Sequence, residues 1–282
     1  MATAPATGAT GPADQAAPPP IAVFMKHLQP LGAAEIARRI ASQPVAGIEA
    51  TLRKGGLIEP HRLAEELPRL CELLARYDRQ IVIAASDVTK VDAQTERYLQ
   101  LLAQHQIRYF RMGYYRYDLT RPLLPQLDQF ARQARQVADL AVSLGLIGLY
   151  QNHAGPQYAG AALWDLLHIF RGIPVDHLAV AVDIRHAAVE LSLSYPAALA
   201  AIEPHRGGLY VKDSRWTNNR PENVPLGQGI AKPVFDLVRR TGLRGPISLH
   251  MEYTDHRDPQ QVEASWQAIC NDIATLQQWL NG

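Results

Sequence analysis

Short apolar runs alternate with longer amphipathic segments along the chain after residue 20, and this alternation restricts the fold more than any other feature. The apolar runs lie at 21–25, 45–50, 81–86, 108–112, 146–150, 178–183, 208–212 and 246–252. Helical segments lie between them, near 32–43, 60–77, 92–106, 124–144, 159–171, 194–203, 231–241 and 258–280. Strands that alternate with helices in this way form a parallel sheet.

Eight such repeats predict a closed (β/α)8 TIM barrel, because that α/β fold typically takes about 250 residues as a single domain. The alternative is an open, doubly wound sheet, which would carry a glycine-rich phosphate turn after the first strand. The segment "MKHLQPLG" that follows the first run has no such turn. We therefore expect one barrel domain over residues 21–282.

Residues 1–20 form an Ala/Pro-rich segment that we expect to be disordered, because it holds too few apolar side chains to offset the entropy of ordering. It has neither the charged start nor the apolar centre of a signal peptide. A cytoplasmic location is the expectation. The alternative is a periplasmic location if a signal peptide has been removed, because this segment resembles a spacer that follows such a signal.

The balance of charge argues against two classes of partner. The chain has 28 Lys and Arg against 27 Asp and Glu, which gives a formal net charge of +1 and no electrostatic case for nucleic acid. No apolar stretch reaches the length of about 18 residues that a membrane helix needs. A small molecule is the expected partner, and homo-oligomerisation is left open.

Polar residues end every predicted strand, which matters because active sites of barrels form at the C-terminal ends of the strands. Each one alone can be a solvated loop residue or part of an ion pair that closes the barrel mouth. Together they predict a site at that rim. They include Lys26, Glu49, Arg53, Asp87, Arg111, Tyr115, Gln151, Asn152, His153, Asp183, Lys212, His250 and Glu252.

The period of two along a strand indicates which of these side chains point into the barrel. In "ISLHME" the apolar side chains share one face, and Ser248, His250 and Glu252 share the other. Asp183 likewise follows two alanines on the inward face of its strand. We expect these small residues to leave room for a pocket beneath Asp183.

The inward carboxylates of Asp183 and Glu252 allow two kinds of chemistry. Together with histidine they suit Mn²⁺, Mg²⁺ or Zn²⁺. Glu252 can also act as a base on the carbon beside a carbonyl, with Lys212 stabilising the enediolate or donating a proton. His153 and His250 are the next candidates for the base.

The remaining polar and aromatic side chains indicate the kind of substrate. Arg53, Arg111 and Arg185 add positive potential for a developing oxyanion. Aromatic residues in the rim loops, Tyr115 and Trp216 among them, offer surfaces for stacking sugar rings. Together these side chains favour a polar, polyhydroxylated and uncharged substrate.

Several segments resemble the sugar phosphate isomerase/epimerase family, the xylose-isomerase-like TIM barrels, over about residues 21–280. The motifs that carry this resemblance are "GIEATLRKGG", "RMGYYRYD", "YQNHAGPQYAGAALWDLL", "VDIRHAAVE", "YVKDSRW", "VPLGQGI" and "ISLHMEY".

The resemblance implies one divalent metal, held in the family by an acid on the fifth strand, Asp on the sixth, His on the seventh and Glu on the eighth. Asp183 matches the sixth-strand ligand and Glu252 the eighth, and His186 matches a histidine that contacts substrate. Gln151 stands where the fifth-strand acid is expected, and Tyr210 stands in place of the seventh-strand histidine. The predicted metal ligands are therefore Asp183, Glu252 and Gln151, with His153 as a further donor.

The resemblance implies an isomerase or epimerase that removes a proton α to a sugar carbonyl with the help of a divalent metal. A close variant is a lyase or hydratase that acts on a keto-sugar or keto-glycoside. The alternative from another class is a barrel that binds carbohydrate without turnover. Phosphorylation of the substrate is left open. The predicted catalytic residues are Glu252, Lys212 and His153, and the predicted substrate contacts are Glu49, Arg53, Arg111, Tyr115, Asn152, Arg185, His186, Trp216 and His250.

Overall fold

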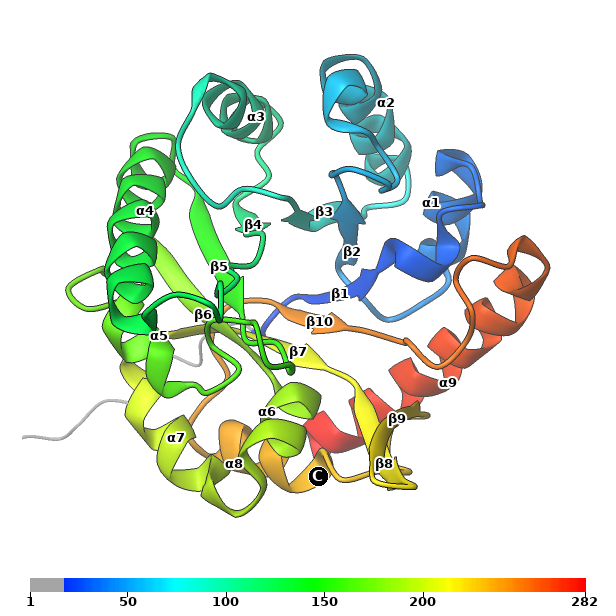
Figure 1. Ribbon diagram of the computed structural model, residues 1–282. Coiled ribbons are helices and arrows are strands. Elements are labelled where there is room, and N and C mark those ends of the chain that lie inside the picture. The colour runs from blue at the N-terminus through cyan, green and yellow to red at the C-terminus, as the bar shows by residue number, and fades with distance from the viewer. Residues whose placement is uncertain (1–17) are drawn as a thin grey trace, which may run out of the picture.

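A closed barrel of eight parallel strands forms the centre of the molecule in the computed structural model, which describes residues 18–282 (Figure 1). Around the barrel the strands follow the order β1 (Ile21–Phe24), β10 (Ile247–Leu249), β7 (Arg206–Val211), β6 (Leu178–Asp183), β5 (Ile147–Gln151), β4 (Tyr109–Arg111), β3 (Gln80–Ala85) and β2 (Gly47–Thr51). The predicted single-domain (β/α)8 barrel is confirmed. The prediction of disorder for residues 1–20 concerns mainly residues 1–17, which lie outside the described part of the chain.

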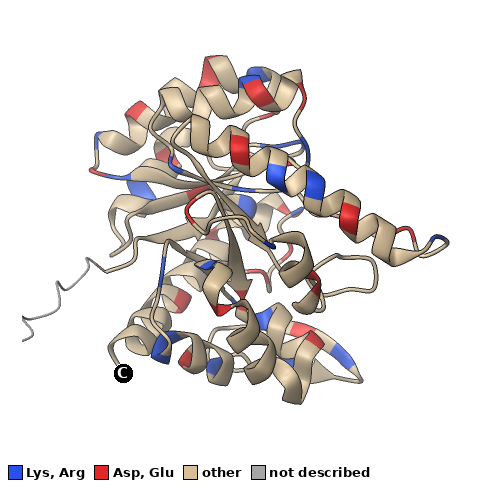
Figure 2. Ribbon diagram, turned by 90° about the vertical axis from the view of Figure 1, so that its left-hand side faces the viewer, with Lys and Arg blue, Asp and Glu red and all other residues tan. Residues whose placement is uncertain are grey.

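Helices surround the barrel on the outside (Figure 1). They are α1 (Ala33–Ala41), α2 (Leu63–Ala75), α3 (Ala93–Gln104), α4 (Leu123–Ser143), α5 (Trp164–Ile169), α6 (Ile184–Leu191), α7 (Tyr195–Ile202), α8 (Lys232–Arg240) and α9 (Val262–Asn281). Short 3-10 turns occur at η1 (Met25–Leu28), η2 (Pro60–Arg62), η3 (Ser192–Ser194), η4 (Glu203–His205) and η5 (Pro259–Gln261). Acidic and basic residues are interspersed over the outer helices (Figure 2), so no large surface of one charge sign covers them.

Two apolar layers hold the barrel together. The inner one fills the barrel and includes Leu149, Ala179, Ala181 and Tyr210. The outer one lies between strands and helices and takes the alternate side chains of β6, Val180 among them. The predicted inward face of β6 is therefore confirmed, and the small alanines lie beneath Asp183 at the C-terminal end of the strand.

A β-hairpin and an extra helix interrupt the simple alternation. The hairpin of β8 (Asp213–Thr217) and β9 (Arg220–Val224) follows β7, and α6 follows β6 directly. The hairpin is polar, so it carries no apolar alternation that would predict a strand. Its turn does carry a signal, because Asn218 and Asn219 both adopt positive φ, the conformation that a two-residue hairpin turn requires.

Asp213 is a structural anchor for this hairpin and the loop after it. Its buried carboxylate accepts backbone hydrogen bonds from Ser214, Gly227, Gly229 and Ala231, at distances of 2.8, 3.0, 3.0 and 3.0 Å. The anchor matters for the site because the hairpin lines the barrel mouth through Glu222 and Asn223.

Replacing Asp213 with alanine is therefore expected to lower the free energy of unfolding by at least about 2 kcal/mol, because buried N–H groups without an acceptor cost about 1–3 kcal/mol each. Urea denaturation measures the loss. Asp139→Ala, on the exposed face of α4, serves as the control and is expected to change the free energy by less than about 0.5 kcal/mol. Equal stability of the two variants would contradict the anchoring role.

Candidate active site

The deepest polar layer of the barrel is centred on the carboxylate of Glu49, on β2. Ser248 Oγ donates to Oε2 of Glu49 at 2.5 Å, and His250 Nε2 lies 2.9 Å from the same oxygen. The Nε of Arg111 lies 3.1 Å from the other carboxylate oxygen. Burial alone would raise the pKa of Glu49, but Arg111 and His250 hold it below its usual value. This layer is a fully buried, charge-balanced floor under the mouth.

A chain of contacts leads from this floor to the opening. Arg111 Nη1 and the hydroxyl of Tyr114 donate to Oε1 of Gln151, at 2.6 and 2.5 Å. The amide nitrogen of Gln151 donates to Oδ2 of Asp183 at 2.6 Å. Lys212 Nζ lies 3.2 Å from the same oxygen of Asp183. Arg111, Gln151, Asp183 and Lys212 are therefore linked across four neighbouring elements of the barrel.

Lys212 contacts both carboxylates at the opening of the barrel. Its ammonium also donates to Oε2 of Glu252 at 2.7 Å, so it bridges two carboxylates, while Lys26 Nζ lies 3.4 Å from Oε1 of Glu252. Burial alone would lower the pKa of Lys212, but the carboxylates of Asp183 and Glu252 raise it above its usual value. Burial would raise the pKa of Glu252, and Lys212 holds it well below its usual range. Both side chains are therefore charged at neutral pH.

A cavity of about 630 Å³ opens above these groups. Lys212 and Glu252 line it, together with His153 and His186, whose rings lie 4.1 Å apart. Burial lowers the pKa of His153 to about 4 and that of His186 well below its usual value, so both imidazoles are neutral at pH 7. The Nε2 of His186 is buried without a hydrogen-bond partner among residues 18–282, and it lies 3.7 Å from Oδ2 of Asp183.

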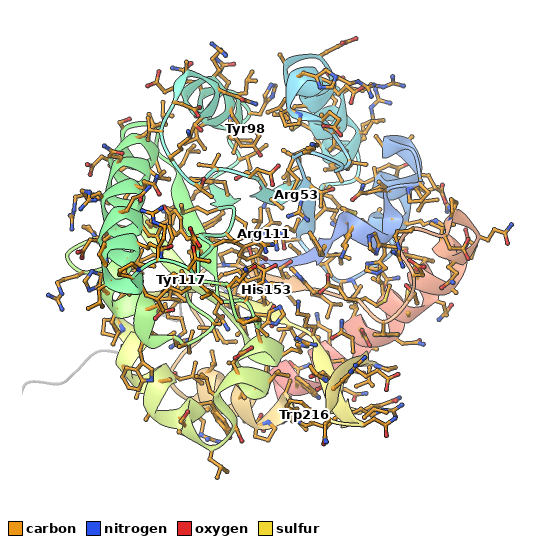
Figure 3. All side chains as sticks on the ribbon, viewed as in Figure 1. Arg53, Tyr98, Arg111, Tyr117, His153 and Trp216 are labelled. Carbon is orange, nitrogen blue, oxygen red and sulfur yellow. The ribbon has the colours of Figure 1, made fainter. Side chains whose placement is uncertain are left out.

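The structure brings most of the predicted site residues together at this end of the barrel. Figure 3 shows Arg111 and His153 over the centre of the barrel, with Arg53 towards β2 and β3. Arg185 lines the cavity and its Nη1 lies 3.1 Å from Nδ1 of His186.

Three predicted substrate contacts, Glu49, Arg111 and His250, are paired with one another in the buried floor and do not line the cavity. Three others lie elsewhere or have other partners. Tyr115 is only 3% exposed and stacks on Phe130 in the outer layer. Asn152 is buried, and its side chain hydrogen-bonds the backbone N–H and C=O of Asp183, at 2.7 and 3.2 Å. Trp216 is 52% exposed and lies out on the hairpin, away from His153 (Figure 3). These three side chains are therefore not placed to contact a substrate in the cavity.

Two residues at the site were not among the predicted site residues. Tyr114, next to Tyr115, directs its hydroxyl to Gln151. The segment after β4 is irregular at this point, so alternation could not tell which tyrosine faces inward. Lys26 follows β1 in η1, and only its position at a strand end pointed to it.

The predicted metal ligands do not fit a divalent ion as they are arranged. Within residues 18–282 no three His, Cys, Asp or Glu side chains lie together as a metal-binding group. The carboxylate oxygens of Asp183 and Glu252 accept hydrogen bonds from the amide of Gln151 and from Lys212. The oxygen of Gln151 faces the donors Arg111 and Tyr114, and the hydroxyl of Tyr210 is buried without a partner in the described part of the chain.

Residues 45–271 match the family described as xylose isomerase-like TIM barrel, and the chain belongs to that family. None of the curated proteins matches the sequence. In the described part of the chain, no helix combines the length and apolarity needed to cross a membrane.

Solved structures of the same fold include several sugar epimerases. The 3-keto-D-glucoside 4-epimerase of E. coli is 17% identical with a TM-score of 0.67, over 92% of this chain and 100% of that one. D-Psicose 3-epimerase of Clostridium cellulolyticum, solved with D-tagatose, is 12% identical with a TM-score of 0.65, over 93% and 99%. A xylose isomerase-like barrel of Mycobacterium smegmatis, solved in complex with magnesium, is 13% identical with a TM-score of 0.64, over 90% and 97%. At these identities the likeness shows the fold.

Proposed function

We propose that this protein is an enzyme of the isomerase or epimerase type that removes a proton from the carbon beside a sugar carbonyl. One observation carries the proposal: the ammonium of Lys212 lies against the carboxylate of Glu252 at 2.7 Å in the wall of an open polar cavity. Proton abstraction next to a carbonyl needs such a pair, a base for the carbon and a cation for the oxygen. The epimerase neighbours act on sugars, which supports the substrate class.

Lys212 is the proposed electrophile. When the carbonyl oxygen of the substrate accepts a hydrogen bond from the ammonium, negative charge that develops on that oxygen is stabilised without rearrangement of the protein. Asp183, 3.2 Å from the ammonium, holds it in place together with Glu252. A buried ammonium whose pKa is raised supplies here the positive charge that the sequence-based prediction assigned to a divalent ion.

Glu252 is the proposed base, and the same contact regulates its strength. In the free protein two lysines stabilise its charged form and make it a weak base. A substrate oxygen that takes an N–H of Lys212 weakens the contact between Lys212 and Glu252, so the basicity of Glu252 rises only when a carbonyl is bound. Neutral His153 and His186 are proposed to hydrogen-bond hydroxyl groups of the sugar.

Proton NMR in D₂O tests the proposal with a panel of aldoses, ketoses and 3-keto-glycosides. The expected result is loss of the signal of the proton beside the carbonyl in at least one of them. New product signals then separate epimerisation from the elimination or hydration variant, since both pass through the same enediolate. Sugars that bind without any exchange would favour a non-catalytic carbohydrate-binding barrel.

Metal content gives a separate prediction. Because Lys212 already occupies the position between the two carboxylates, the purified protein offered Mn²⁺, Mg²⁺ or Zn²⁺ is expected to bind far less than one equivalent in its barrel mouth. Isothermal titration and elemental analysis measure the uptake. Stoichiometric uptake that disappears in Asp183→Ala would contradict the assignment and restore the metal-assisted prediction.

A further inference from the structure

A second depression, which we call the basic groove, adjoins the cavity of the candidate active site. It has a volume of about 470 Å³. Its basic side chains are Lys26, Arg53, Lys54 and Arg257, and Asp87 is its one carboxylate within the described chain. The whole protein is nearly neutral, so this excess of cations is a local feature of the mouth.

Two of these four cations have carboxylate partners and two do not. Lys26 lies 3.4 Å from Glu252, and Arg257 Nε lies 3.0 Å from Asp255. Arg53 and Lys54 have no ion pair with any residue in the described range 18–282. Asp87 accepts a hydrogen bond from the backbone N–H of Lys54 at 3.1 Å.

Arg53 is the informative member of this set because it is half-buried. Its guanidinium donates no hydrogen bond to another described residue, although it is partly withdrawn from water. Burial lowers the pKa of Arg53, and the charge of Arg111 lowers it further. A half-buried guanidinium in this position is therefore in an unfavourable environment that a bound anion would relieve.

The basic groove is continuous with the reaction centre. Lys26, His256 and Arg257 line both the groove and the cavity that holds Lys212 and Glu252. A molecule with its carbonyl at Lys212 can therefore extend past Lys26 and place another group at Arg53.

We propose that the basic groove binds the carboxylate or phosphate of an anionic sugar, with Arg53 as the main contact. This inference rests on the proposed function for the sugar part of the ligand, and it revises the uncharged substrate favoured by the sequence alone. The planar fork of donors on arginine fits the oxygens of either anion. The arginines that line the active-site cavity already have partners, Arg185 with His186 and Arg257 with Asp255, so Arg53 is the better candidate.

Calorimetry at low ionic strength tests the proposal with glucose, glucuronate and glucose 6-phosphate. We expect one or both anionic sugars to bind at least about tenfold more tightly than glucose, since hydrogen bonds to charged groups carry about that factor or more. Added salt should reduce this preference. The stronger of the two anions identifies carboxylate or phosphate as the group recognised. Inorganic phosphate and acetate serve as second probes that have no sugar ring to misfit.

The Arg53→Gln variant should lose the preference and bind glucose as the wild type does, while Arg53→Lys should keep part of it. Arg132→Gln, on the exposed face of α4, is the matched control and should behave as the wild type. Equal affinity for neutral and anionic probes, no Arg53-dependent binding of any anion, or a loss that follows Arg185→Gln and not Arg53→Gln would overturn the proposal.

These binding measurements involve no turnover, so they separate the two proposals. Anion binding that depends on Arg53, in a protein that exchanges no deuterium, would keep the basic groove and overturn the enzyme proposal. Deuterium exchange with neutral sugars, without any preference for anions, would do the reverse.

Discussion

Glu252→Gln is expected to slow both turnover and deuterium exchange by about 10²- to 10⁴-fold, the usual loss when a general base is removed. Glutamine keeps the shape of the side chain and its hydrogen bond from Lys212, but it cannot accept a proton from carbon. Substrate affinity should change little, so the loss should appear in kcat. Exchange rates from NMR and product formation measure the two quantities on the same samples.

The exposed Glu96→Gln change on α3 controls for the loss of a carboxylate in general and should leave both rates unchanged. A thermal unfolding curve shows whether the Glu252→Gln variant keeps its fold. Exchange at the wild-type rate in a folded Glu252→Gln protein would assign the base to another side chain, with His153, which lines the cavity, as the next candidate.

Lys212→Ala is expected to lower kcat by about 10²- to 10³-fold, the range observed when one donor to a developing oxyanion is removed. The variant also removes the charge that holds the pKa of Glu252 down. The pKa of Glu252 should therefore rise, and the low-pH fall in activity should move to higher pH than in the wild type. A pH–rate profile shows this shift, which a merely structural role of Lys212 would not produce.

Chemical rescue distinguishes the ammonium from the lysine stem. Methylammonium added to Lys212→Ala should restore part of the lost rate, because the cation fits the space beside Asp183 and Glu252. Loss of a buried partner can cost about 3–5 kcal/mol of stability, so Lys212→Arg, which keeps the charge, is the second variant. The exposed Lys90→Met change is the control. Wild-type turnover by folded Lys212→Ala would remove Lys212 from the mechanism.

Sequence patterns were sufficient to predict the fold and the inward direction of the key side chains. Eight repeats of strand and helix specify the barrel, and a period of two places Asp183, Lys212 and Glu252 on the inner face. Both patterns arise from backbone geometry, which the order of apolar residues reports directly.

Side-chain pairing could not be predicted in the same way. Gln151 directs its nitrogen to Asp183, and Lys212 bridges Asp183 and Glu252. These pairings depend on rotamers and on which strands become neighbours. The sequence therefore indicated a depleted metal site, and the three-dimensional arrangement indicates an ammonium between the carboxylates. The orientation of Tyr115 could not be predicted either, because the segment after β4 is irregular and shows no periodic pattern.

Deuterium exchange by metal-stripped protein tests the central proposal most directly. The protein is treated with a chelator, passed into metal-free D₂O, and mixed with the sugar that exchanges fastest in the NMR panel. We predict that the proton beside the carbonyl exchanges as fast as with untreated protein, and that Lys212→Ala exchanges it far more slowly. Exchange that stops on metal removal and returns when Mn²⁺ or Mg²⁺ is added would contradict the proposal that the ammonium of Lys212 supplies the positive charge.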